Sequence, residues 1–297
     1  MPGASGAHIT LLGLGAMGSA LAQKVHEAGY RTTVWNRTPA RAAALARQGA
    51  HATEDLREAI HASPVVIACL LDHASVHEAL DPVADALRGR ALINVTTTSP
   101  NESREIGTWA RENDIDYLDG GIMAVPSMIG NPGAAILYSG SAKVFEEHRS
   151  LLNLWADATY YGEDAGMASL YDLAMLSGMY VMFAGFMHGA AMVGSENVSA
   201  SEFAAKAVPF LRAMVDEMPG YAKTIDDGDY AGPGQQSLEF SDLTHIVTAS
   251  QEQGVSSAPI AMVQELIRRQ LDAGYGREGF ARIYESLRNG PERKVCA

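Results

Sequence analysis

Three glycines near the N-terminus restrict the fold of this chain more than any other feature. The motif consists of Gly13, Leu14, Gly15, Ala16, Met17 and Gly18. It follows a short apolar run and opens a helical stretch, so the three glycines would provide a tight turn, close approach of a pyrophosphate, and close packing of the helix on the sheet. The first N–H groups of the helix then face the phosphates. We therefore expect a dinucleotide-binding unit here, rather than a glycine turn without a ligand.

The first half of the chain alternates short apolar runs with amphipathic stretches. This pattern is typical of βαβ units under a parallel sheet. The predicted strands are residues 8–12, 32–35, 65–71, 91–95, 116–118, 134–138 and 158–161. After Gly162 the strand pattern stops and the chain becomes helical, so we predict an α/β Rossmann domain over residues 1–162.

One long segment, residues 173–193, contains no Asp, Glu, Lys or Arg and could cross a bilayer by length alone. Its flanks carry acidic residues instead of the Lys and Arg that fix membrane orientation, so we expect a buried helix and no membrane. With Asp164 as a plausible N-cap, it becomes a long interdomain helix over residues 163–194. Residues 195–297 are then an all-α C-terminal domain.

Charge and cysteine content exclude other classes. With 22 Lys and Arg against 35 Asp and Glu, the net charge of −13 would repel a phosphate backbone, so we expect no nucleic acid partner. Cys69 and Cys296 are too few for a disulfide framework or a zinc cluster. With no secretory signal pattern at the N-terminus, we expect a cytoplasmic protein.

The end of the second strand indicates which dinucleotide binds. An enzyme for NAD usually places Asp or Glu about 20 residues after the glycines, to bind the ribose hydroxyls. Here the strand ends at Asn36, Arg37 and Thr38, with Arg41 following. These residues offer the charge and hydrogen bonds that a 2′-phosphate needs. We therefore predict NADPH as the cofactor; the alternative is that the arginines are ordinary surface charges.

These residues resemble the β-hydroxyacid dehydrogenase superfamily and, within it, the NADPH-dependent imine reductases. Residues 162–176 match a second imine reductase signature, in which Gly162, Asp164, Gly166 and Asp172 stand at the matching positions, and residues 119–126 also look like that family. The resemblance implies a homodimer with exchanged helical domains, each active site lying between one Rossmann domain and the partner's helices. It implies hydride transfer from NADPH to a (cyclic) imine or iminium carbon, giving an amine.

The chain departs from the hydroxyacid dehydrogenases at their catalytic positions. The family's lysine corresponds to Asp172, its two asparagines to Met175 and Leu176, and its substrate-binding serine to Met123. These changes remove the groups that would hold a carboxylate or activate a hydroxyl. A β-hydroxyacid dehydrogenase-like reductase and a catalytically silent NADPH-binding protein are the alternative functions.

Asp172 is the predicted catalytic residue. Imine reduction needs a proton at nitrogen as well as a hydride at carbon, and a carboxylate can donate the proton or stabilise the iminium cation. Its neighbours at the helical three and four spacing are apolar, so burial should raise its pKa. The alternative is a structural role near the helix start.

The remaining candidates concern the cofactor, the substrate and a metal. Further cofactor-binding candidates are Leu70, Leu71 and Thr96, and the substrate-pocket candidates are Met123, Met175, Leu176, Met179, Phe210, Met214, Phe240 and His245. His73 and His77 lie one helical turn apart, but without a recognisable third ligand we expect no metal site there.

Overall fold

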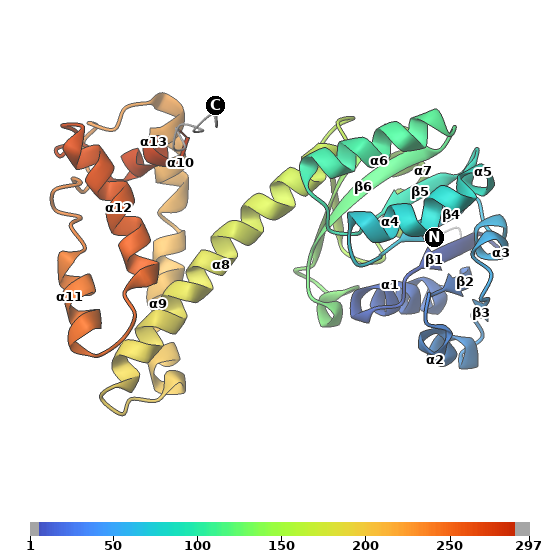
Figure 1. The fold of residues 1–297 in the computed structure, drawn as a ribbon, viewed down its shortest axis with the longest axis horizontal. Helices are drawn as coiled ribbons and strands as arrows, with labels where there is room; N and C mark the ends of the chain where they lie inside the picture. The colour runs from blue at the N-terminus through green and yellow to red at the C-terminus, as the bar shows by residue number, and fades with distance from the viewer. Residues whose placement is uncertain (1–5, 289–297) are drawn as a thin grey trace, which may run out of the picture. The chain divides into compact units, whose positions relative to one another are not determined.

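The computed structural model describes residues 6–288 and divides the chain into two units, the first ending at Leu176 and the second beginning at Ser177 (Figure 1). Cys296 lies outside the described residues. The first unit is built on an eight-stranded sheet with the order β3-β2-β1-β4-β5-β6-β7-β8. The strands are β1 (His8–Leu12), β2 (Arg31–Trp35), β3 (His51–Ala52), β4 (Val65–Ala68), β5 (Ala91–Asn94), β6 (Asp116–Met123), β7 (Ala135–Gly140) and β8 (Asp157–Tyr160).

The sheet has a strand at each of the seven predicted places, but β4 ends at Ala68 instead of Leu71 and β6 extends to Met123 instead of Leu118. It differs from the prediction in two further respects. The two-residue strand β3 was not predicted, because so short a segment carries no alternation of apolar residues. The sheet is also not wholly parallel, since β7 runs antiparallel to β6. The two are joined by a short connection containing the 3₁₀ helix η3 (Pro126–Met128) and no crossover helix, and such a connection favours an antiparallel return.

Helices cover both faces of the sheet because successive strand residues point to opposite sides. Val65 and Ile67 of β4 pack in one hydrophobic cluster, and Val66 and Ala68 pack in the other. The helices of this unit are α1 (Ala16–Glu27), α2 (Ala43–Arg47), α3 (Leu56–His61), α4 (His73–Leu80), α5 (Ala84–Leu87), α6 (Pro100–Glu112) and α7 (Ala142–Leu152), with 3₁₀ turns η1 (Pro39–Ala42) and η2 (Asp81–Val83). The result is a Rossmann-type α/β domain, as predicted.

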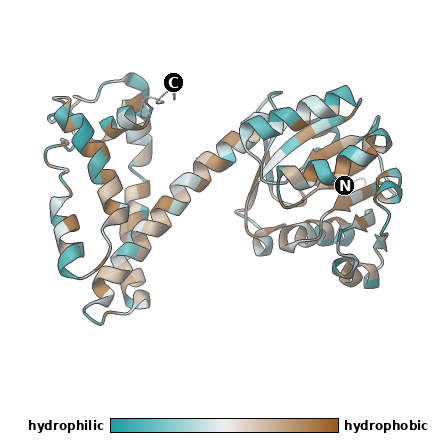
Figure 2. Cartoon of the chain, viewed as in Figure 1, coloured by the Kyte–Doolittle hydropathy of each residue, from teal (hydrophilic) through white to brown (hydrophobic). Residues whose placement is uncertain are grey.

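The long helix α8 (Gly166–Gly194) begins in the first unit and ends in the second. The Asp164 carboxylate accepts a hydrogen bond from the Gly166 N–H at 3.0 Å, which satisfies one free donor at the helix start. Arg104 donates two hydrogen bonds to the same carboxylate, both at 2.8 Å. Figure 2 colours most of α8 white to brown. By length and composition alone it could cross a membrane, but a single such helix is weak evidence for a span.

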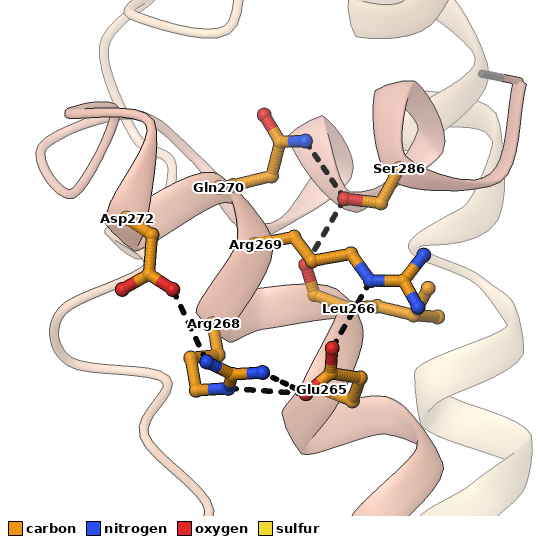
Figure 3. A network of polar contacts seen from close by, with 7 residues as sticks. All are labelled: Glu265, Leu266, Arg268, Arg269, Gln270, Asp272 and Ser286. Atoms are coloured by element: carbon orange, nitrogen blue, oxygen red, sulfur yellow. Dashed lines mark hydrogen bonds and ion pairs between the residues drawn. The ribbon is translucent and has the colours of Figure 1, made fainter. Parts of the chain in front are cut away.

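The second unit is helical, as predicted. Its helices after α8 are α9 (Ala200–Val215), α10 (Met218–Asp227), α11 (Thr244–Glu252), α12 (Ala258–Asp272) and α13 (Ile283–Arg288), with the 3₁₀ turn η4 (Phe280–Arg282). Polar contacts join α12 to α13: the Gln270 amide donates to the Ser286 hydroxyl, which donates to the Leu266 carbonyl (Figure 3). On α12 itself, Glu265 accepts hydrogen bonds from Arg268 and Arg269 (Figure 3).

Candidate functional site

A groove of about 590 Å³ lies in the first unit, past the carboxyl ends of β1, β2 and β4. In a doubly wound sheet this edge is where ligands bind. Predicted cofactor residues that line it are Gly13, Gly15, Asn36, Arg37, Thr38, Arg41, Leu70 and Leu71. The sequence analysis missed other lining residues, namely Trp35, Leu56, Cys69, Ser75, Glu78, Ala79, Pro82 and Val83.

The glycine loop fits an anionic ligand. At Gly13, φ is +93° and a Cβ would overlap the Cys69 carbonyl oxygen, so the turn requires glycine. Gly15 faces open space, which leaves room for a phosphate. The helix α1 that follows has no side-chain N-cap and no acidic residue in its first turn, whereas α3, α4 and α6 are capped by Asp55, Asp72 and Ser99. Its first N–H groups are therefore free to bind an anion.

The candidates for the 2′-phosphate take different positions. Arg37 is exposed, and its Nη1 lies 3.6 Å from Oε2 of Glu78 on α4. Thr38 and Arg41 also line the groove. Asn36 accepts a hydrogen bond from the Leu14 N–H at 2.8 Å and donates one to the Thr38 carbonyl at 2.9 Å. Asn36 therefore ties the glycine loop to the end of β2, in addition to lining the groove.

Five predicted cofactor residues do not line this groove. They are Leu14, Ala16, Met17, Gly18 and Thr96. Leu14 and Gly18 are buried, and a Cβ at Gly18 would overlap the Gly13 carbonyl oxygen, so Gly18 shapes the loop. The Thr96 hydroxyl accepts a hydrogen bond from the Leu70 N–H at 2.9 Å, which holds the turn after β4 in place.

The groove residues that sequence analysis missed come mainly from α4 and the turns beside it. Ser75, Glu78 and Ala79 lie on α4, which follows β4 directly. Because the turn after a central strand meets the same sheet edge as the glycine loop, the position of α4 was the available signal. Glu78 matters most among them, because it brings a carboxylate to a groove that should bind a phosphate.

Asp172 is buried in the first turns of α8, with 3% of its surface exposed. Its Oδ1 atom has no hydrogen-bond partner, and burial raises the pKa of this carboxyl group to about 6. This confirms the predicted direction of the pKa shift. The helix can lie this close to the sheet because β6 offers Gly121, where a Cβ would come within 2.7 Å of the Asp172 Cβ.

A second buried carboxyl group, Asp119, lies on β6 near Asp172. It accepts hydrogen bonds from the Tyr117 hydroxyl at 2.8 Å and from the Ser169 hydroxyl at 2.9 Å. Burial, together with a smaller electrostatic effect of Asp172, raises the pKa of Asp119 to about 7 although these hydrogen bonds oppose the shift. The sequence analysis had noted Asp119 only as part of a family motif. The two carboxyl groups differ in their hydrogen bonds: both oxygens of Asp119 accept one, whereas the Oδ1 atom of Asp172 accepts none.

The predicted substrate-pocket residues fall into two groups. Met123, Met175 and Leu176 belong to the first unit, where Met123 ends β6 and the other two follow Asp172 on α8. Met179, Phe210, Met214, Phe240 and His245 belong to the second unit. Phe210, Met214 and Phe240 are exposed there.

In the structure a third potential metal ligand, which the sequence did not reveal, lies beside His73 and His77. Glu105 on α6 lies beside them, and one potential ligand atom from each of the three residues lies within 4.8 Å of the others. Sequence spacing could not find this group, because Glu105 is remote along the chain and only helix packing brings it close.

Two family models match the chain. Residues 8–162 match the NAD binding domain of 6-phosphogluconate dehydrogenase, and residues 164–289 match the C-terminal domain of the NADPH-dependent reductive aminase-like family. An NADPH-dependent reductive aminase from Aspergillus oryzae is 40% identical over 288 residues, which cover 95% of this chain and 98% of the relative.

Solved structures agree with these matches. The reductive aminase from Aspergillus terreus, in complex with NADPH4, cyclohexanone and allyl amine, superposes with a TM-score of 0.90 at 40% identity and covers 95% of this chain and 99% of its own. The imine reductase from Myxococcus stipitatus, in complex with NADP+, has a TM-score of 0.90 at 34% identity and covers 94% of this chain and 99% of its own.

Proposed function

Because the chain belongs to the NADPH-dependent reductive aminase and imine reductase family, we propose that it reduces the C=N bond of imines or iminium ions to amines, with hydride supplied by NADPH. The chain is an oxidoreductase, and NADPH is its cofactor. The solved structure of a relative of 40% identity holds a ketone and an amine. We include in the proposal that this chain also accepts a ketone and an amine together, and reduces the imine that they form.

The groove of the first unit supports the cofactor assignment residue by residue. The uncapped N-terminus of α1 and the open face of Gly15 can bind the pyrophosphate. Arg37, Arg41 and Thr38 can bind the 2′-phosphate, and Arg37 would exchange its contact with Glu78 for this stronger anion. Asn36 and Thr96 would support cofactor binding indirectly. Asn36 holds the glycine loop through the Leu14 N–H, and Thr96 holds the turn after β4 through the Leu70 N–H.

Asp172 carries the catalytic proposal. Its free, buried Oδ1 and raised pKa keep a fraction of the carboxyl group protonated near neutral pH, so it can donate a proton to the imine nitrogen. In its ionised form, the same carboxylate would stabilise an iminium cation. The lysine of the hydroxyacid dehydrogenases would instead repel that cation. Either role assigns Asp172 to the nitrogen and leaves the carbon to the hydride.

The proposed assembly is a homodimer with exchanged helical domains. Apolar side chains of α8 such as Tyr180, Val181 and Met187 are exposed in the single chain, and a soluble monomer rarely tolerates so large an apolar surface. A partner subunit would cover them. In this dimer the substrate would contact Met123, Met175 and Leu176 of one subunit, while Met179, Phe210, Met214, Phe240 and His245 would come from the partner's helices. The proposed compartment is the cytoplasm, and no membrane is involved.

The test follows the absorbance of the reduced nicotinamide of NADPH with three substrate sets. A cyclic imine should be reduced fast. A ketone mixed with a primary amine should be turned over more slowly, and a β-hydroxyacid with NADP+ should not be turned over. Fast oxidation of the hydroxyacid would contradict the proposal. Tight NADPH binding without turnover of any imine would also contradict it, and would favour a silent binding protein.

A further inference from the structure

We propose that His73, His77 and Glu105 form a binding site for a divalent transition metal, with Zn²⁺ as the best fit, that links α4 to α6. The potential ligand atoms are two imidazole nitrogens and a carboxylate oxygen, and they lie within 4.8 Å of one another. Nitrogen and oxygen ligands of this kind suit zinc. The site is separate from the reduction chemistry proposed above.

The first argument comes from the hydrogen bonds of the histidines. Nδ1 of His77 lies 2.9 Å from Oδ1 of Asp81, and because a carboxylate accepts, the Nδ1–H must donate. The Nε2 atom of a neutral His77 is then unprotonated, with its lone pair free. Metal-binding histidines are commonly oriented in this way, by a carboxylate on the nitrogen that does not bind the metal.

The second argument is that each of the two histidines has a ring nitrogen without a hydrogen-bond partner. Nε2 of His73 and Nε2 of His77 are buried and make no hydrogen bond. The contact of His73 Nε2 with Glu105 Oε2 is 3.5 Å, longer than an ordinary hydrogen bond. Buried polar atoms without partners are rare, and a bound cation would satisfy both nitrogens at once.

The third argument is geometric. His73 and His77 are four residues apart on α4, so they share one face of the helix. Glu105 lies on α6 one turn before Trp109, whose ring meets the His77 ring edge to face at 5.9 Å. At bond lengths of about 2.0–2.1 Å, three ligands of a tetrahedral zinc lie roughly 3.3 Å apart. A small rotation of the imidazoles and of the exposed Glu105 side chain would reach this spacing, leaving the fourth position to water.

The surrounding charge favours a cation. Asp72 and Glu102 lie close enough to His73 to interact with it electrostatically, and Asp81 contacts His77. The opposite face of α4 carries Ser75, Glu78 and Ala79, which line the cofactor groove. A metal bound here would therefore hold in place a helix that forms one wall of that groove.

Calorimetric titration of Zn²⁺ into the full-length, chelator-treated protein tests the site. We expect one zinc ion to bind per chain at a site formed by His73, His77 and Glu105. Its binding should be more than about tenfold weaker in His73→Gln and in His77→Gln. Asp81→Asn should weaken binding by about 10- to 100-fold, the range for a partner of a ligating histidine. His51→Gln is the matched control, because His51 also lies beside a glutamate, 3.3 Å from Glu58, but the described residues place it in no group of three potential ligands.

Two further measurements make the test decisive. Zinc should raise the Tm of the wild type but not that of His77→Gln, because only a folded site binds. Anomalous diffraction at the zinc edge should place the ion between α4 and α6. If His73→Gln and His77→Gln, shown by circular dichroism to be folded, bind zinc like the wild type, or if the wild type binds none, the proposal is wrong.

Discussion

The two units bury their apolar side chains to very different extents. In the first unit, both faces of the sheet are covered, and residues such as Leu12, Val66 and Ile93 are fully buried. In the second, the buried hydrophobic residues among those described are Tyr230, Leu238, Ile267 and Ala281. Of the 22 exposed large hydrophobic side chains within residues 6–288, 17 belong to the second unit. Met187 on α8, for example, is 66% exposed.

This contrast shows which parts of the protein can be complete in one chain. The first unit has a closed core and its own cofactor groove, so it should fold and bind NADPH by itself. The second unit exposes apolar surface that water disfavours, so we expect it to be completed by a partner. Asp172 belongs to the first unit and is buried, but its Oδ1 atom accepts no hydrogen bond from the described residues.

The largest expected effect comes from charging the exposed surface of α8. The double variant Val181→Glu, Met187→Glu should dissociate the proposed dimer and reduce imine turnover to the background rate, while NADPH still binds to the first unit. Both side chains are exposed in the single chain, so the fold of the chain itself loses no buried contact. Light scattering measures the assembly, and fluorescence titration measures NADPH binding.

The matched control for this variant is Ala46→Glu, which adds a carboxylate at an exposed position of α2 in the first unit. It should leave mass and turnover unchanged. An active α8 variant with the mass of one chain, 31.6 kDa, would show that the second unit needs no partner subunit. The two units would then not differ in what a single chain can complete.

The next largest effect is expected from Asp172→Asn, which keeps the shape of the side chain but removes its charge and its acidity. Turnover of a neutral cyclic imine should fall by about 10²-fold or more, and NADPH affinity should not change. If Asp172 is the acid, turnover of a neutral imine by the wild type should fall as pH rises above about 6, because the acid form of Asp172 is lost. Stopped-flow kinetics across about pH 5–9, where the rate should fall roughly one decade per unit above the pKa, measures both.

An N-alkylated cyclic iminium separates the two roles of Asp172, since it needs no proton from the enzyme. If Asp172 acts as the acid, this substrate should lose much less rate in Asp172→Asn than the neutral imine does. If it acts as a counter-charge, both substrates should lose rate. Near-native rates on every imine would show that Asp172 is structural, and would direct attention to Tyr171, Tyr180 or water as the proton source.

The unsatisfied carboxyl group should also make the folded state sensitive to pH. The pKa of Asp172 is raised from 3.8 to about 6 on folding, so the folded state binds the proton more tightly than the unfolded state. Stability from this group is complete below pH 3.8 and is lost as pH rises through about 6. Asp172→Asn should therefore unfold with a free energy roughly 2–3 kcal/mol higher than the wild type at about pH 8.

Urea denaturation at fixed protein concentration, at mildly alkaline and at low pH, checks this sign. The gain should shrink at low pH, where the wild-type carboxyl group is also neutral. A variant that is less stable than the wild type at mildly alkaline pH would mean that the ionised carboxylate has a stabilising partner in the folded protein. The described residues of this chain provide no hydrogen-bond partner for Oδ1, so the proposed partner subunit would be the expected source.

The sequence predicts the first unit better than the second for a physical reason. Glycines, strand alternation and a helix start act locally, so Gly13, Gly15 and the ends of β1 and β2 could be placed from short motifs. The antiparallel direction of β7 follows from its short connection to β6, a local signal that the strand prediction did not use. The position of Glu105 beside His73 and His77 depends on packing between distant segments, which no local pattern encodes. Candidates such as Phe210 and Phe240 rest on position in the chain alone, and their exposure in the single chain leaves them as predictions.

The candidate site shows the same limit at the level of single residues. Asp172 was found because a substitution at a family position coincided with apolar neighbours at the helical spacing. Its burial and raised pKa follow from that pattern. Glu78 was missed because it lies on α4, and only the fold brings it within 3.6 Å of Arg37.

A smaller effect, confined to the first unit, is expected from Arg37→Ala. The KM for NADPH should rise by about tenfold, and the KM for NADH should hardly change, because only NADPH carries the 2′-phosphate. Arg47→Ala is the control, since Arg47 is exposed on α2 but does not line the groove. Equal losses with both cofactors would show that Arg37 does not bind the phosphate.

The smallest effect is expected from Glu78→Gln, which tests whether the groove is fully formed for NADPH. Glu78 both repels a 2′-phosphate and contacts Arg37, so its removal should lower the KM for NADPH by about two- to threefold, a modest gain because both side chains are exposed. The gain should shrink at high salt.

The control is Glu112→Gln, on the exposed end of α6, which should leave the KM for NADPH unchanged. If the gain disappears in an Arg37→Ala background, Glu78 acts by occupying Arg37; if it persists, Glu78 repels the phosphate directly. A higher KM for NADPH in Glu78→Gln would instead mean that Glu78 holds Arg37 in position for the phosphate. The groove of a single chain would then already be arranged for NADPH, just as the core of the first unit is already closed in a single chain.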